Sequence, residues 1–160
     1  MDFEHDSHRE VHLKVHEYLS ELFDDPYLDP DNGHFYVGYG STVLEISIEP
    51  YGPEETIARI SAYCVQDVST DDNLLLGLLE LNHEMPVGGF SLVGNDIYYS
   101  HSLFGKSLDR NSLLGGIAAV ATISDDYDDR IVAKYGGQTA LGKIRDTGGR
   151  QKRTPPVAAE

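Results

Sequence analysis

Seven histidines are the residues whose spacing most readily suggests chemistry. Four of them, His5, His8, His12 and His16, lie near the N-terminus, and the last three are four residues apart. Histidines one helical turn apart can bind one divalent ion together. These positions lie beside the apolar face of the segment, however, and the sequence places no carboxylate or cysteine to complete a site. We therefore interpret them as an exposed polar stripe, with a metal-dependent enzyme as a less favoured alternative.

Two further groups of potential metal ligands are also better explained as structure. His83 and Glu84 lack the second histidine of a zinc-protease helix, because Pro86 interrupts the segment where that residue would lie. The acidic run Asp125–Asp129 lies inside a helical pattern, which directs carboxylates outward. A calcium loop instead turns sharply around a central glycine. We interpret the run as a solvated helix face.

Nucleophile and cofactor motifs are also missing from the sequence. Cys64 lies on the predicted core face of a strand, where an apolar setting raises the pKa of a thiol and makes it inert. The sequence contains no G-x-S-x-G elbow, no phosphate loop and no G-x-G-x-x-G fingerprint. We therefore predict no catalytic residue, no metal ligand and no cofactor, and we expect that the protein is not an enzyme.

The elements that would position these residues begin with a helix. Ser7 and Glu10 match a capping box, and the apolar residues that follow, from Val11 to Phe23, recur at helical spacing. Three segments with strand-like alternation come next, at residues 35–40, 44–49 and 56–65. Short loops between them imply an antiparallel meander.

A second helix, a hairpin and a long third helix complete the pattern. Ser69 or Thr70 can cap the second helix, which is rich in leucine. Gly94–Asp96 is the predicted turn of the hairpin. The third helix starts at the N-cap Asp109 and ends at glycines 136 and 137. The order α-β-β-β-α-β-β-α predicts an α+β fold, with a five-stranded, mostly antiparallel sheet and helices packed on it. We expect a single domain over residues 1–137 and a basic, disordered tail over residues 138–160.

The charge is large and unevenly distributed. The net charge of the 160 residues is −15, although residues 138–160 carry five basic side chains and only two acidic ones. An acidic body repels phosphate backbones and anionic membranes and attracts basic polypeptides. No apolar run is long enough to span a bilayer, and the acidic N-terminus does not resemble a secretory signal. One cysteine fits a reducing compartment, so we expect a cytoplasmic protein that binds neither nucleic acid nor membranes.

The second helix is the best candidate for an interaction surface. Leucines surround it, so it is either buried on most sides or buries one face in a partner. We predict that Leu75, Leu78 and Leu79 form a surface for homodimerisation or for a protein partner. The alternative is that these leucines and the many tyrosines all pack internally.

Several segments resemble the YbjN-like domain family, whose fold is related to type III secretion chaperones. They are residues 40–43, 56–62, Leu81–Pro86, 89–94, 97–103 and 125–134, of which the stretch from Asn82 to Leu103 is the most specific. The resemblance covers residues 8–137. It implies the same α-β-β-β-α-β-β-α order, frequent homodimers and binding of extended or unfolded peptides without catalysis. The favoured hypothesis is therefore a non-enzymatic, chaperone-like module for protein or peptide clients, some of them basic. The alternative is a regulatory adaptor for one protein partner.

Overall fold

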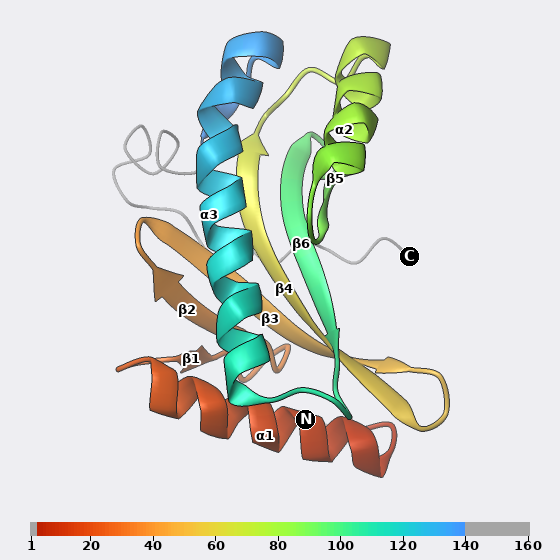
Figure 1. Cartoon of the computed structure of the whole chain (residues 1–160), viewed down its shortest axis with the longest axis vertical. Coiled ribbons are helices and arrows are strands. Elements are labelled where there is room, and N and C mark those ends of the chain that lie inside the picture. Colours follow the sequence, from red (N-terminus) through yellow and green to blue (C-terminus); the bar gives the residue numbers. More distant parts are fainter. Residues whose placement is uncertain (1–2, 140–160) are drawn as a thin grey trace.

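Residues 3–139, which the computed structural model describes, form one antiparallel sheet and three helices (Figure 1). The helices are α1 (Asp6–Leu22), α2 (Asp72–Glu84) and α3 (Arg110–Tyr135). The strands are β1 (Tyr27–Leu28), β2 (Phe35–Tyr39), β3 (Thr42–Tyr51), β4 (Glu55–Gln66), β5 (Gly89–Val93), β6 (Asp96–Phe104) and β7 (Gln138–Thr139). The predicted α+β fold is confirmed.

In the described part of the chain the sheet has seven strands, two more than predicted. Its order is β1-β2-β3-β4-β6-β5, and β7 pairs with the end of β4. The additional strands, β1 and β7, have two residues each, too few for an alternating pattern to be visible in the sequence. Strand β7 lies beyond residue 137, where we expected the domain to end, and residues 140–160 of the predicted tail lie outside the described residues.

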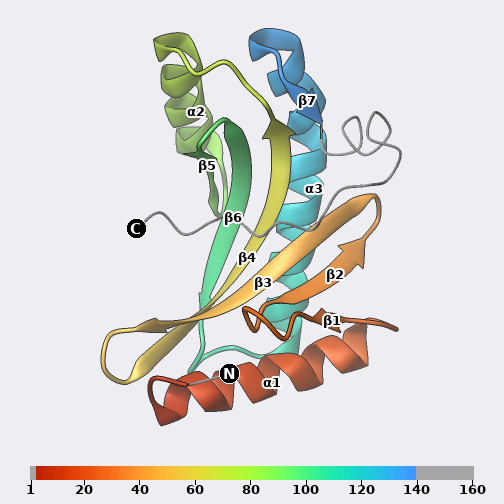
Figure 2. The ribbon, with the colours of Figure 1, turned by 180° about the vertical axis from the view of Figure 1, so that it is seen from behind.

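One face of the sheet carries the core. Residues of this inner face alternate along each strand, and the register aligns Phe35 with Ile46, Ile46 with Ile60, and Ala62 with Tyr99. All five of these side chains are buried. Helix α3 crosses the inner face, and α1 packs against the lower end of the sheet (Figure 1). Seen from behind, the outer face has no described helix lying across it (Figure 2).

Helix ends follow the expected chemistry, although two of the predicted caps are wrong. The predicted N-cap Asp109 is confirmed, and it forms a reciprocal capping box with Ser112. Helix α1 is capped by His5, whose ring accepts a hydrogen bond from the backbone of His8. Helix α2 is capped by Asp71, not by Ser69 or Thr70. The Ser7 hydroxyl instead lies 3.2 Å from the Thr56 hydroxyl, so contact with β4 determines its role.

Gly105, directly after β6, contacts both α1 and the beginning of β4. Its amide donates a 2.7 Å hydrogen bond to the Thr56 carbonyl, and its carbonyl accepts one from Lys14 at 3.3 Å. A Cβ at this position would lie 2.9 Å from the Thr56 oxygen and would overlap the Val11 side chain. The close approach of three segments therefore requires glycine here.

We expect Gly105→Ala to lower the free energy of unfolding by about 1–3 kcal/mol, the usual cost of overpacking a tight contact. The control is Gly115→Ala in α3, because a Cβ there would meet no atom within 4 Å. Removing a mid-helix glycine should raise stability by roughly 0.5–1 kcal/mol. Urea denaturation of both variants measures the two effects, and equal stabilities would contradict the packing account.

Candidate peptide-binding surface

Helix α2 lies at the edge of the sheet beside β5 and exposes a stripe of leucines. Leu74 and Leu78 are buried, with Leu78 only 5% exposed. Leu75, Leu76 and Leu79 are 41%, 60% and 66% exposed. Positions three and four residues apart share a helix face, so the exposed leucines form one continuous apolar stripe.

Of the three predicted surface leucines, the structure exposes Leu75 and Leu79 but places Leu78 in the core. Leu76, which we did not predict as a surface residue, belongs to the exposed stripe instead of Leu78. A helix with leucines on all sides does not reveal in sequence which of them faces the sheet.

Asn82 fastens α2 to β5. Its side-chain amide donates to the Phe90 carbonyl at 3.0 Å, and its carbonyl oxygen accepts from the Phe90 amide at 2.6 Å. The side chain therefore pairs with the outer edge of β5 as a neighbouring strand would. Any added strand is excluded at Phe90 while Asn82 keeps these bonds. Tyr99 holds the preceding loop, because its hydroxyl donates to the Val87 carbonyl.

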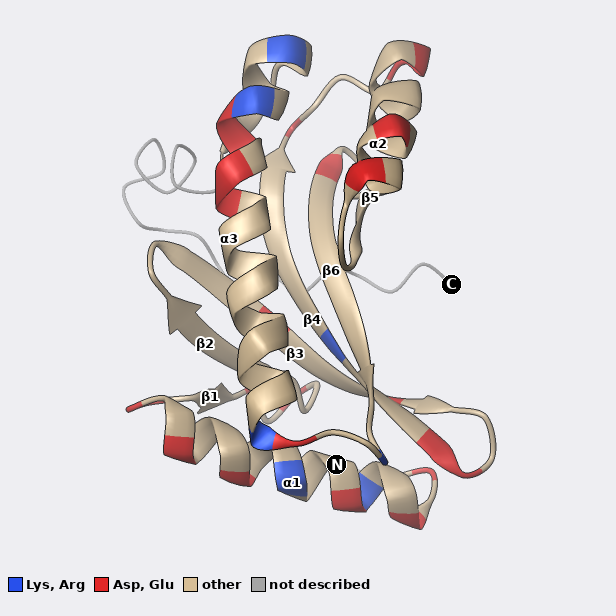
Figure 3. Cartoon of the chain, in the orientation of Figure 1, with Lys and Arg blue, Asp and Glu red and all other residues tan. Residues whose placement is uncertain are grey.

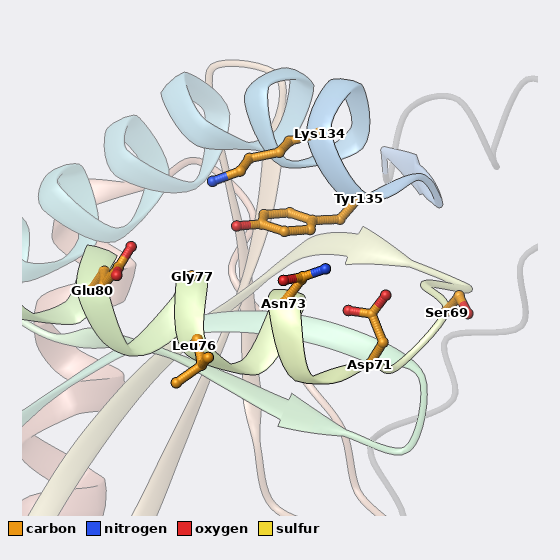
Figure 4. Close-up of a pocket in the computed structure, with 8 residues that line it drawn as sticks. All are labelled: Ser69, Asp71, Asn73, Leu76, Gly77, Glu80, Lys134 and Tyr135. Atoms are coloured by element: carbon orange, nitrogen blue, oxygen red, sulfur yellow. The ribbon is translucent and has the colours of Figure 1, made fainter.

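A polar groove lies between α2 and the end of α3 (Figure 4). Its volume is about 450 Å³. The Tyr135 ring covers Gly77, where a Cβ would collide with the phenol oxygen. Lys134 lies over the Tyr135 ring at 4.9 Å from its centroid. A hydrogen bond with Tyr135 raises the pKa of Lys134. The lining residues are Ser69, Asp71, Asn73, Leu76, Gly77, Glu80, Lys134 and Tyr135.

Acidic residues lie along α2 and along α3, the two helices that border this groove (Figure 3). Asp71, Asp72, Glu80 and Glu84 belong to α2 or its cap, and the run Asp125–Asp129 lies on α3. Burial raises the pKa of Asp128, the least exposed member of the run. The acidic run lies within a helix, as predicted, and its carboxylates do not converge on a loop.

We predicted an exposed histidine stripe, but the structure buries two of its members. His8 and His12 are each only 6% exposed, because α1 lies against the sheet along this face as well as along Val11 and Val15. The His8 ring lies 3.1 Å from the Ile48 carbonyl, and the His12 ring 3.3 Å from the Gly33 carbonyl. Both rings act as structural hydrogen-bonding groups.

Within residues 3–139, no group of three or more His, Cys, Asp or Glu side chains is placed to hold a metal ion. Cys64 lies in the core as predicted, with its thiol donating toward the Ser124 carbonyl at 3.4 Å. Burial raises the pKa of this thiol far above its ordinary value. The described part of the chain also contains no helix with the length and apolar character of a membrane span.

Comparison with known proteins agrees with a surface that binds polypeptides. Residues 9–143 match the family described as T3SS (YopN, CesT) and YbjN peptide-binding chaperone 1. This chain belongs to that family. Its family membership indicates a peptide-binding module of the chaperone type, and it confirms the resemblance seen in the sequence.

Solved structures support the fold. One chain of the ExsC–ExsE complex shares 12% identity with a TM-score of 0.59, over 78% of this chain and 96% of that one. A chain of the HopA1–SchA chaperone–effector complex shares 15% identity with a TM-score of 0.54, over 76% of this chain and 94% of that one. No curated protein sequence matches significantly.

The stability of this family member should fall in mild acid through His12. Burial lowers the pKa of His12, and the charges of His8 and His16 lower it further, while the Gly33 carbonyl opposes the shift. Below the ordinary pKa of 6.5, the unfolded chain takes up a proton more readily than the folded chain. The free energy of unfolding should therefore fall as the pH drops through 6.5, and change little with His12 above that.

Urea denaturation from pH 8 to pH 5 measures this dependence. His12→Gln keeps a donor for the Gly33 carbonyl and removes the titration, so its pH slope should be shallower than that of the wild type. His83→Gln, at an exposed position of α2 and outside the set of groups that act on His12, is the control and should keep the wild-type slope. A His12→Gln slope equal to the wild-type slope would assign the acid sensitivity to other groups.

Proposed function

We propose that this protein is a non-enzymatic, cytoplasmic chaperone-like module that acts as a homodimer and binds basic peptide segments of client proteins. The observation that carries the proposal is the exposed stripe of Leu75, Leu76 and Leu79 on α2. A contiguous apolar stripe with a polar surround is typical of an interaction surface.

The stripe suits a second copy of the same chain. Helix α2 contacts the rest of the fold mainly through β5, so one side of it is free for a partner helix. In a two-fold dimer the same patch of both subunits meets, and the leucines of one α2 then cover those of the other. The acidic residues at the rim stay in solvent in this arrangement.

The charge suits basic clients. Residues 1–139 contain 25 acidic and 7 basic side chains, a net charge of −18. Such a surface attracts cationic polypeptides and repels anionic ones, more strongly at low salt. Extended clients can pair with the edge of the sheet at β2, because β1 covers only Phe35 and Tyr36 of that strand.

Leu75→Asp/Leu79→Asp should convert a dimer to a monomer of 17.7 kDa, because four carboxylates would be buried at the interface. Sedimentation equilibrium measures the mass, and circular dichroism checks the fold. The control is Leu13→Asp on α1, which is 58% exposed and should leave the mass unchanged. A folded double variant with the wild-type dimer mass, or a monomeric wild type, would contradict the interface.

The preference for basic clients is tested with two labelled peptides of about 20 residues. One alternates Lys or Arg with Leu or Val, and the other carries Glu at every basic position. We expect the basic peptide to bind at least tenfold more tightly at 50 mM salt, and its affinity to fall at 300 mM. Fluorescence anisotropy measures both. Equal affinities, or tighter binding of the acidic peptide, would contradict the charge argument.

A further inference from the structure

The last described strand, β7, ends close to the point where β3 begins to pair with the same edge of β4. In β7, Gln138 pairs with Gln66 and Thr139 pairs with Val65. The same edge of β4 is occupied by β3 as far as Ala62, which pairs with Leu44. Only Tyr63 and Cys64 lie between these two pairings, so this edge of β4 offers little room for further strand pairing beyond Thr139.

Helix α3 already occupies the inner side at this position. Gly137 packs against the end of β4, where a Cβ would lie 2.8 Å from the Val65 and Val68 side chains and from the Gln66 carbonyl oxygen. The Cys64 thiol faces Ser124 of α3 from the same side. The outer face, which no described helix covers, is the side that offers room (Figure 2).

Tyrosines form a cluster on that outer face near the end of β7. Tyr63 and Tyr98 are cross-strand partners whose ring centroids lie 4.3 Å apart, and Tyr63 is the more exposed of the two, because Tyr98 is only 7% exposed. Tyr36, on β2, lies on the same face. Its pKa is raised mainly by burial, and the charges of Glu45 and Tyr63 raise it further. Tyrosine combines a large apolar surface with a polar tip, and its ring attracts Lys and Arg.

Acidic groups also predominate on this face. The strand register places Glu45, Glu49 and Glu55 there, and Asp96 follows on β6. The described strands bring one Lys or Arg to the same face, Arg59, which pairs with Glu49 at 3.1 Å, and the His34 ring pairs with Glu45. The surface therefore has excess negative charge beside its aromatic rings.

The segment that begins at this point has the opposite charge. Residues 140–160 contain five Lys or Arg and two acidic residues, with Ile, Leu and Val among them. At roughly 3.3 Å per residue, an extended chain of that length can reach about 70 Å, well beyond the length of β4. We propose that residues 140–160 dock on the outer face of their own sheet, with basic side chains on the tyrosine cluster and its carboxylates.

Zero-length carbodiimide cross-linking of the full chain tests the contact. An equal mixture of ¹⁴N- and ¹⁵N-labelled protein separates links within one molecule from links between molecules. We expect Lys143 or Lys152 to link to Glu45, Glu49 or Glu55 of the same molecule. Links found only between molecules would assign the segment to a second copy. Links only to acidic residues of α1 or α2, or no links at all, would also overturn the proposal.

Cysteine labelling provides an independent measurement in the full chain. Ser102→Cys places a thiol at an exposed position of the outer face, and Ser20→Cys places one on α1 as the control. Reversing Lys143, Arg145 and Arg150 to Glu should speed bulky maleimide labelling at position 102 at least fivefold and leave position 20 unchanged. Salt at 1 M should act similarly.

The buried Cys64 reports on folding in the same experiment, because its labelling stays slow while the core is intact. An unchanged rate at position 102 in the charge-reversed chain, with Cys64 still protected, would overturn the proposal. These outcomes are independent of the binding of client peptides, which is measured separately.

Discussion

The packing of α3 across one face of the sheet is the interaction on which the rest of the structure depends. Its inward residues, among them Leu113, Ile117 and Val120, are fully buried against the strands. Gly116 lets the helix approach closely, because a Cβ there would lie 2.7 Å from the end of the Ile60 side chain. Since α1 also packs on this face, the helices of residues 3–139 leave the opposite face of the sheet without a helical layer.

Because the described helices cover only one face of the sheet, the candidate site consists of exposed surfaces and not of an enclosed catalytic pocket. His8, His12 and Cys64, which have potential for catalysis, are held in the core by hydrogen bonds to backbone carbonyls. Apolar and acidic side chains remain outside, on α2 and on the outer face of the sheet. Apolar area contributes affinity for polypeptides, and a uniform charge selects among them by sign. Such surfaces fit a member of a peptide-binding chaperone family.

Much of the fold could be predicted from local patterns. Alternation along residues 44–49 and helical spacing along residues 113–135 each reflect one repeating geometry, and the structure has a strand and a helix there. Asp109 was predictable as a cap because its partner, Ser112, lies three residues away. The caps of α1 and α2 were not, because several polar residues compete at each helix start and packing decides among them.

The sequence by itself determined the fold class, the acidic charge, the core position of Cys64 and the membership of a family. These depend on composition or on residues close together in the chain. Only the tertiary structure decided that Leu78 faces the core while Leu76 faces solvent, and that His8 and His12 are buried. It also revealed that Asn82 closes part of the β5 edge. Each of these outcomes depends on how a helix is rotated against a sheet, and that rotation is set by contacts between residues far apart in the sequence.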